Sequence, residues 1–196
     1  MGLIKTVTKA TVSALLVITA LVLLVNKQSV YDWYALLDYS PNTSISTLAV
    51  NSGMSSRSTN VFYVYKPEIL EKNAFNASCP VNEETIVLGC YDGQKIYLFN
   101  VTDQKLNGIK EVTAAHEMLH AEYDRLSQKE KDKVNILIEK QLATIQDSRI
   151  KTNIEAYRKK DPSIVINEAH SIFGTEVAKL DPDLEKYYSR YFTDRS

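Results

Sequence analysis

The pattern of hydrophobic and polar positions divides the chain into an apolar N-terminal run, a middle part with short extended segments, and a helical C-terminal half. The first run, residues 10–26, is uncharged and consists largely of Leu, Val, Ile and Ala, and it follows Lys5 and Lys9. Its length is at the lower end of the roughly 17–25 residues with which a helix spans a bilayer. We therefore expect residues 1–28 to form a short cytoplasmic stub and one transmembrane helix.

A cleaved secretory signal is the alternative interpretation, because such signals also combine a basic start with an apolar core. No convincing small-x-small cleavage site follows the run, and the aromatic cluster of residues 31–34 resembles the interfacial belt of a membrane anchor. The lysines before the run place the N-terminus in the cytoplasm, although Lys27 opposes this bias. We expect a single-pass protein of the cell membrane, with a juxtamembrane linker at residues 29–43 and an outward-facing domain at residues 44–196.

Three short segments follow the linker. Residues 44–50 favour a helix that ends at Gly53. Residues 61–65 are β-branched and aromatic and precede Lys66-Pro67, so they predict a strand. Residues 67–75 predict a short helix or turn.

Two further extended runs, residues 85–88 and 95–100, are joined by an Asp-Gly turn at residues 92–93 and predict a β-hairpin. Cys79 and Cys90, the two cysteines of the chain, bracket the first run. In a domain that faces outward they predict one disulfide, with two buried thiols as the alternative. A pair without further cysteines is a poor zinc site, so neither is expected to be a ligand.

The helical signals of the C-terminal half are clearest at its N-caps. Ser127 and Glu130 have the spacing of a capping box. The pairs at 161–162 and 181–182 are both Asp-Pro, which places an N-cap before a proline at the first helical position. We expect helices after each of these starts, and a further polar helix at about residues 148–160.

Composition limits the classes of function. The 196 residues suffice for one domain with a sizeable core plus an appendage. The net charge is −1, with acidic and basic residues mixed along the chain and no basic stripe. No nucleic-acid partner is therefore expected, and the oligomeric state is not indicated.

The strongest chemical signal is the H-E-x-x-H motif that runs from His116 to His120. Residues four apart lie on one face of a helix, so both imidazoles can bind one Zn²⁺ while Glu117 acts as the general base for a water at the metal. The alternative is a pair of ordinary surface histidines beside a glutamate. The uncharged residues 113–115 favour a buried helix instead, and two of the chain's three histidines are in this motif. We therefore expect a zinc site.

A catalytic zinc usually has three protein ligands and one open position. Residues 164–176 are the best source of the third, because they contain Glu168, His170 and Glu176 on one expected helix. The two glutamates are eight residues apart and share a face, whereas His170 is about 200° away from Glu168. Asp124, one turn after His120, could orient the ring of that histidine, or it could be an exposed helix carboxylate.

With these residues in place, a family resemblance becomes visible. H-E-x-x-H followed by a glutamate on a later helix resembles the gluzincin class of zinc metallopeptidases. More narrowly, residues 112–127, 167–176 and 187–192 resemble bacterial membrane-anchored proteins with HEMLHA and E-x-H-S-x-x-G-T-E segments. The resemblance implies a small α+β zincin-like domain with a short N-terminal antiparallel sheet and a helical C-terminal half. Residues 95–100 would be the edge strand that borders the cleft.

The resemblance also assigns roles to the residues. His116, His120 and Glu168 would hold zinc, and Glu117 would be the catalytic base. A carboxylate completes the gluzincin-type set, and Glu168 is favoured over Glu176 because it follows the apolar residues 164–166, which should bury it. His170 or a tyrosine would stabilise the oxyanion as a second catalytic group; for His170 the alternative is a hydrogen-bonded core histidine.

The function that follows is a membrane-anchored zinc metallopeptidase that hydrolyses a peptide or protein substrate. Two alternatives are a zinc hydrolase of a non-peptide substrate and a non-catalytic zinc-binding surface module. The presence of Glu117 argues against the non-catalytic module, because binding a metal through His116 and His120 does not require that glutamate.

Overall fold

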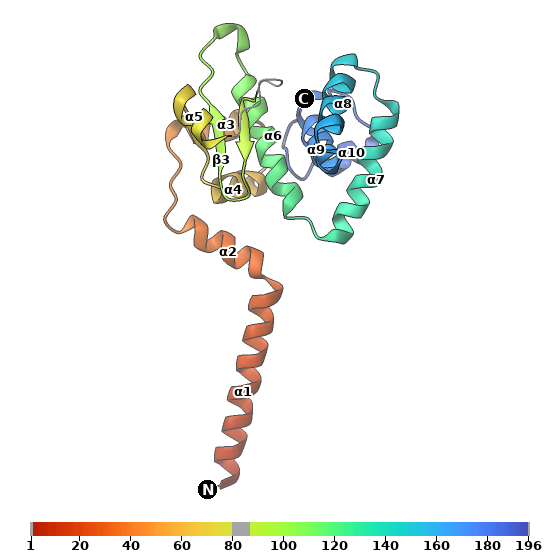
Figure 1. Cartoon of the computed structure of the whole chain (residues 1–196). Coiled ribbons are helices and arrows are strands. Elements are labelled where there is room, and N and C mark those ends of the chain that lie inside the picture. The colour runs from red at the N-terminus through yellow and green to blue at the C-terminus, as the bar shows by residue number, and fades with distance from the viewer. Residues whose placement is uncertain (1, 80–86, 196) are drawn as a thin grey trace. The chain divides into compact units, whose positions relative to one another are not determined.

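The computed structural model describes residues 2–79 and 87–195 and divides the chain into two compact units, Met1–Ser40 and Pro41–Ser196 (Figure 1). The first unit contains α1 (Gly2–Val25) and α2 (Lys27–Leu36). No single helix among the described residues has the length and apolarity required to cross a membrane, but α1 from Val12 onward and α2 pass that test together as a pair bent by 75°. The segment expected to be a linker is thus helical in its first part.

The second unit begins with two short helices, α3 (Thr43–Asn51) and α4 (Ser56–Val64). The expected helix at residues 44–50 is confirmed as α3. The strand predicted at residues 61–65 is wrong, because most of that segment is the end of α4. The Ser55 side chain caps α4 by accepting the N–H of Ser58. Val61, Phe62 and Val64 of α4 are buried, and α4 packs against a later helix. Tertiary packing therefore overrides the local β propensity.

The sheet of the described residues consists of β1 (Glu68–Leu70), β2 (Gly89–Tyr91) and β3 (Ile96–Phe99), in the order β1-β3-β2. Strand β3 is parallel to β1 and antiparallel to β2, so the sheet is mixed and not antiparallel throughout. The expectation that residues 95–100 form an edge strand is therefore wrong. β3 is central, and within the described part of the chain β2 is an edge strand.

The hairpin and the disulfide are confirmed. The Asp92 side chain accepts the N–H groups of Gln94 and Lys95, and Gly93 adopts a φ of 88°, which favours glycine. Cys79, at the end of α5 (Lys72–Ser78), is bonded to Cys90 of β2. The first predicted hairpin strand falls at residues 85–88, of which 85 and 86 lie outside the described residues, and β2 begins only at Gly89.

The helical half follows the sheet, and the fold as a whole is α+β. Its Ser127–Glu130 capping box and its Asp161 and Asp181 caps are all confirmed. Its elements are η1 (Gln104–Leu106), α6 (Ile109–Asp124), α7 (Gln128–Thr144), α8 (Ser148–Lys160), η2 (Pro162–Ile164), α9 (Val165–Glu176) and α10 (Pro182–Tyr188).

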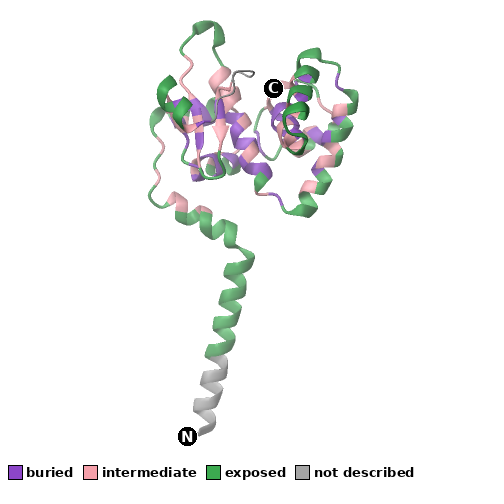
Figure 2. Cartoon of the chain, viewed as in Figure 1, coloured by how far each residue is buried: buried purple, intermediate pink, exposed green. Residues whose placement is uncertain are grey.

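The centre of this unit is the packing of α6 against α9, where buried positions gather in Figure 2. Gly174 of α9 lies at the contact. A Cβ atom added there would be 2.3 Å from Leu119 Cδ1 and 2.9 Å from Tyr188 Cε1. Both neighbours are fully buried, and the Tyr188 hydroxyl donates to the His170 carbonyl at 2.5 Å. The glycine therefore sets how closely the two helices approach.

Gly174→Ala is expected to lower the free energy of unfolding by about 1–3 kcal/mol, because overpacking a close contact costs about this much. Helix propensity alone predicts the opposite sign, a gain of about 1 kcal/mol from replacing glycine within a helix. Urea unfolding of wild type and Gly174→Ala shows whether the overpacking cost or the gain in helix propensity is larger. A more stable alanine variant would show that the contact relaxes without cost.

Candidate metal centre

Two helices bring the three predicted metal ligands together. His116 and His120 lie one turn apart on α6, and Glu168 lies in the first turn of α9. Glu168 Oε2 is 3.8 Å from the Nε2 atom of each histidine. One ligand atom from each of the three residues can be chosen so that all lie within 4.8 Å of one another. Two ligands of one tetrahedral zinc are roughly 3.3 Å apart for bonds of about 2.0–2.1 Å, so small side-chain shifts would suffice.

The ring of His120 is oriented by the residue that precedes Glu168. Asn167 Oδ1 lies 3.0 Å from His120 Nδ1. When Nδ1–H donates this hydrogen bond, the lone pair of Nε2 is free on the side that faces Glu168. One turn of α9 thus supplies both the candidate carboxylate ligand and the group that selects the histidine tautomer.

Asn167 takes the role that the sequence suggested for Asp124. Asp124 is exposed, at the end of α6, and the contact to His120 Nδ1 comes from Asn167. The sequence signal for Asn167 was its position next to Glu168 near the start of a helix. An asparagine beside a ligand is an ordinary helix residue until the second helix is placed.

Asn167→Leu, which keeps the size but removes the acceptor, is expected to weaken metal affinity by about 10–100-fold, as is typical when the orienting partner of a histidine ligand is lost. Competition with a chromophoric chelator measures this affinity. Asn167→Asp retains an acceptor and should bind within a few-fold of wild type. Asp124→Asn is the control and should leave the affinity unchanged; an equal loss in this control would restore the role first suggested for Asp124.

Glu117 is buried beside the three residues. Burial raises the pKa of its carboxyl from 4.5 to about 7, against the lowering effect of nearby His120. The backbone N–H of Tyr91 in β2 donates to this carboxylate. Gly89 of the same strand lies so close that an added Cβ would be 2.9 Å from Glu117 Oε1. The edge strand therefore holds Glu117 in place.

The Glu168 carboxylate is more accessible, with 17% of its side chain exposed. Its burial by itself would raise its pKa, but a hydrogen bond from His116 and the charges of both histidines hold the pKa below the ordinary value. The Tyr157 hydroxyl of α8 also donates to Glu168. Sequence reasoning allowed for a tyrosine at the site but did not identify Tyr157, because the polar pattern of α8 does not mark it.

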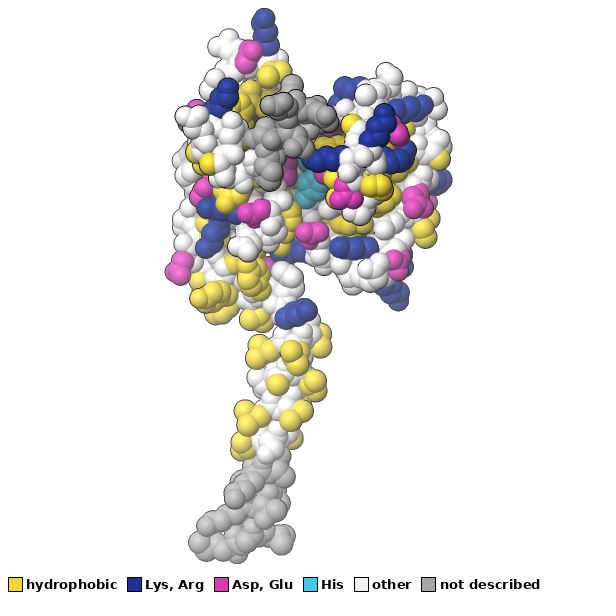
Figure 3. Space-filling view, in the orientation of Figure 1, with side chains coloured by type: hydrophobic (Ala, Val, Ile, Leu, Met, Phe, Trp, Pro, Cys, Tyr) yellow, Lys and Arg dark blue, Asp and Glu magenta, His cyan; other side chains and the backbone are white. Residues whose placement is uncertain are grey.

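A cavity of about 480 Å³ opens onto these residues. Figure 3 shows histidine side chains at the surface between the sheet part and the C-terminal helices. A second hollow of about 240 Å³ also reaches His116, Glu117 and Tyr157. The larger cavity is lined by β2 and by residues of α6, α8, η2 and α9, including Tyr91, Asp124, Lys160, Ile164 and Asn167.

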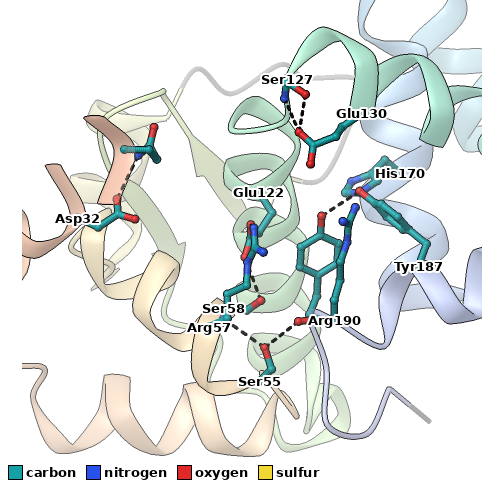
Figure 4. A network of polar contacts seen from close by, with 12 residues as sticks. Asp32, Ser55, Arg57, Ser58, Glu122, Ser127, Glu130, His170, Tyr187 and Arg190 are labelled. Carbon is teal, nitrogen blue, oxygen red and sulfur yellow. Dashed lines mark hydrogen bonds and ion pairs between the residues drawn. The ribbon is translucent and has the colours of Figure 1, made fainter. Parts of the chain in front are cut away.

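His170, predicted as a second catalytic group, lies in the core and not among the residues that line these cavities. Its Nε2 is 2.8 Å from the Tyr187 hydroxyl (Figure 4), and the Tyr123, Tyr188 and Tyr191 rings also surround it. Burial holds its pKa well below the ordinary value. This placement matches the alternative of a hydrogen-bonded core histidine, and we do not carry the catalytic role further.

The other acidic residues near the motif have separate partners. Glu176, the rival third ligand, forms an ion pair with Arg149. Glu122, two residues after His120, is fully buried and accepts hydrogen bonds from Ser58 Oγ at 3.1 Å and Arg57 Nη2 at 3.4 Å (Figure 4). Neither carboxylate belongs to the group formed by the two histidines and Glu168.

Comparisons of the chain with models of protein families, with curated proteins and with solved structures found no match. The assignment of a function therefore rests on the residues and their geometry.

Proposed function

We propose that this chain is a zinc-dependent peptidase that a membrane anchor at its N-terminus holds at the cell surface. The observation that carries the proposal is the convergence of His116, His120 and Glu168 beside the buried Glu117 at an open cavity. Two imidazoles and one carboxylate are a ligand set of catalytic zinc sites, which keep a further position for water or substrate.

The residues have distinct tasks in this reaction. Zinc, when bound by His116, His120 and Glu168, supplies Lewis acidity for a carbonyl oxygen. Glu117 takes a proton from the attacking water and passes it to the leaving amine, the two transfers expected of a general acid–base. The Tyr157 hydroxyl, which donates its one hydrogen to Glu168, can stabilise the negative charge on the substrate oxygen only when it turns from Glu168 to that oxygen.

The edge strand supports a peptide as the substrate. Among the described residues β2 pairs only with β3, and Gly89, Cys90 and Tyr91 line the cavity beside Glu117. An extended peptide can add to such an edge through main-chain hydrogen bonds, which would place its carbonyl groups next to the metal ligands. This assigns to β2 the role that the sequence suggested for residues 95–100.

The burial of Glu117 favours catalysis over a non-catalytic zinc module. A carboxylate with little exposure and a raised pKa is costly to maintain at neutral pH, and metal binding does not require it. Groups with strongly shifted pKa values in a cavity are typical of active sites.

The proposed location rests on the apolar run and its preceding lysines, with support from the Cys79–Cys90 bond. Structural disulfides persist in oxidising compartments and are rare in the cytosol. Protease added to intact cells should therefore digest the second unit, whereas digestion only after lysis would contradict the outward orientation.

The proposal is tested by metal analysis and a peptide-library assay on the purified full chain. We expect one zinc per chain, hydrolysis that stops on chelation, and recovery when zinc is restored. Zinc without hydrolysis of any library peptide would favour one of the two alternatives, a non-peptide hydrolase or a binding module. Failure to bind zinc would reject the metal site itself.

A further inference from the structure

The exposed face of α2 is the feature that the catalytic proposal does not use. Val30, Trp33, Tyr34 and Leu37 occur at i, i+3, i+4 and i+7, so they form one stripe along the helix. Their exposed fractions are 39%, 64%, 70% and 55%, and α2 has no buried residue. Leu37 continues the helical backbone conformation beyond Leu36. The protein therefore presents a continuous apolar stripe to its surroundings.

The other side of α2 carries polar residues together with Ala35 and Leu36. Gln28 donates to the Asp32 carboxylate at 3.1 Å, one turn apart on the face away from the stripe. Ala35 also lies off the stripe and is small. A short helix with aromatic residues on one face and polar residues on the other is suited to the boundary between water and an apolar medium.

The junction between α1 and α2 indicates that this apolar medium is lipid. Asn26 leaves the helical conformation, its side-chain amide donates to the Val22 carbonyl at 2.8 Å, and the chain bends by 75° (Figure 1). The apolar side chains of α1 from Val12 to Val25 are exposed, as expected for a helix surrounded by lipid. When α1 lies along the membrane normal, a bend of this size turns α2 nearly parallel to the membrane surface.

We propose that α2 is an interfacial helix whose stripe lies in the lipid headgroup region next to the end of α1. The inference rests on the proposed membrane anchor but not on the metal site. Trp and Tyr concentrate at this depth because their rings are apolar while their N–H and O–H groups remain hydrated. Amphipathic helices of this kind embed their apolar face about 5–10 Å into the headgroup and acyl boundary.

An embedded α2 also limits the substrates of the proposed peptidase. Only residues 38–42 connect the α2 end to α3, and a chain of this length reaches at most about 20 Å when extended. The catalytic unit would then be tethered close to the lipid. The substrate class that follows is protein segments next to the membrane, in preference to free peptides in bulk solution.

Trp33 makes the test direct, because it is the only tryptophan of the chain. The full-length protein is reconstituted in vesicles, flotation establishes that it is anchored, and Trp33 fluorescence is measured with nitroxides at different depths of the lipid. We expect strong quenching by a nitroxide near the headgroup, weak quenching by one at the acyl-chain end, and little quenching by aqueous iodide.

Three outcomes would overturn the proposal. Strongest quenching by the deep nitroxide would mean that α1 and α2 form one bent span. Quenching by iodide alone would place the stripe in water. Protection from every quencher would mean that protein covers the stripe, either a second copy or the chain itself. Loss of flotation would instead reject the anchor, and zinc content is measured separately.

A matched pair of variants checks the stripe. The double variant Val30→Ser/Leu37→Ser makes the stripe polar without altering Trp33, and it should lose most of the headgroup-nitroxide quenching while still floating with the vesicles. Ala35→Ser adds a hydroxyl away from the stripe and should behave as wild type. Equal quenching in all three proteins would show that the stripe does not hold Trp33 at the interface.

Discussion

Replacing His116 or His120 with alanine is expected to abolish stoichiometric zinc binding. Each change removes one of three donors that lie within 4.8 Å of one another, and the remaining pair cannot complete a tetrahedral site. The loss should exceed the roughly 10–100-fold loss expected at Asn167, which only orients a ligand. Metal analysis after dialysis measures this, and thermal unfolding verifies that the variants are folded. Undiminished zinc in either folded variant would refute the site.

Glu168, the proposed third ligand, can be tested against a second glutamate on the same helix. Glu168→Gln should lose zinc, because Glu168 Oε2 lies 3.8 Å from both histidine Nε2 atoms. Glu176→Gln makes the same chemical change eight residues later, where the carboxylate pairs with Arg149, and it should retain zinc. The reverse result would show that α9 sits differently against α6.

Glu117→Gln is expected to reduce hydrolysis by about 10²–10⁴-fold, the usual contribution of a general base, while zinc content stays at the wild-type level. The amide has nearly the same shape and can still accept the Tyr91 N–H. Turnover measured at equal zinc occupancy separates this result from ligand loss. Wild-type turnover in the variant would assign the proton transfer to another group.

The same variant should be more stable than wild type when both are metal-free and the pH is high. Burial raises the pKa of Glu117 from 4.5 to about 7, so ionisation disfavours the folded state. The stabilising contribution of the protonated carboxyl is complete below the unfolded pKa and disappears as the pH rises through the folded one. Above pH 7 the glutamine variant should gain about 3 kcal/mol, since each pKa unit corresponds to about 1.4 kcal/mol.

Urea unfolding at pH 8 and near pH 4 tests whether ionisation of Glu117 destabilises the folded protein. The difference between the two proteins should be present at pH 8 and should vanish near pH 4, where the glutamate is protonated in both states. Glu111→Gln, which makes the same chemical change in the first turn of the same helix, is the matched control. A glutamine variant that is less stable at pH 8 would mean that the buried charge is well compensated.

Several features of the fold were predictable from the sequence because neighbouring residues determine them. The spacing of His116 and His120 places both rings on one side of α6 through the helical period alone. The caps at Ser127, Asp161 and Asp181 depend on hydrogen bonds within three residues, and the turn after β2 depends on Gly93. Such signals do not depend on where the rest of the chain lies.

Other features were decided by contacts between distant parts of the chain. Residues 61–65 have the composition of a strand, yet most of them end α4 because burial against α6 favours the helix. The order β1-β3-β2 makes residues 96–99 central, which no local pattern specifies. His170 is buried among tyrosines of α6, α10 and the segment after α10, a placement that its chemical type alone does not indicate.

The residues of the candidate site also divide into those that local sequence determines and those that tertiary contacts determine. The sequence by itself determined the histidine pair and its glutamate, since an i, i+4 spacing is a property of one helix. It favoured Glu168 over Glu176 only weakly, because both lie on one face of α9. The tertiary structure brought Glu168 and Asn167 to the histidines and left Glu176 with Arg149. The physical reason is that the close contact at Gly174 sets how α9 lies against α6, and helix packing is not encoded locally.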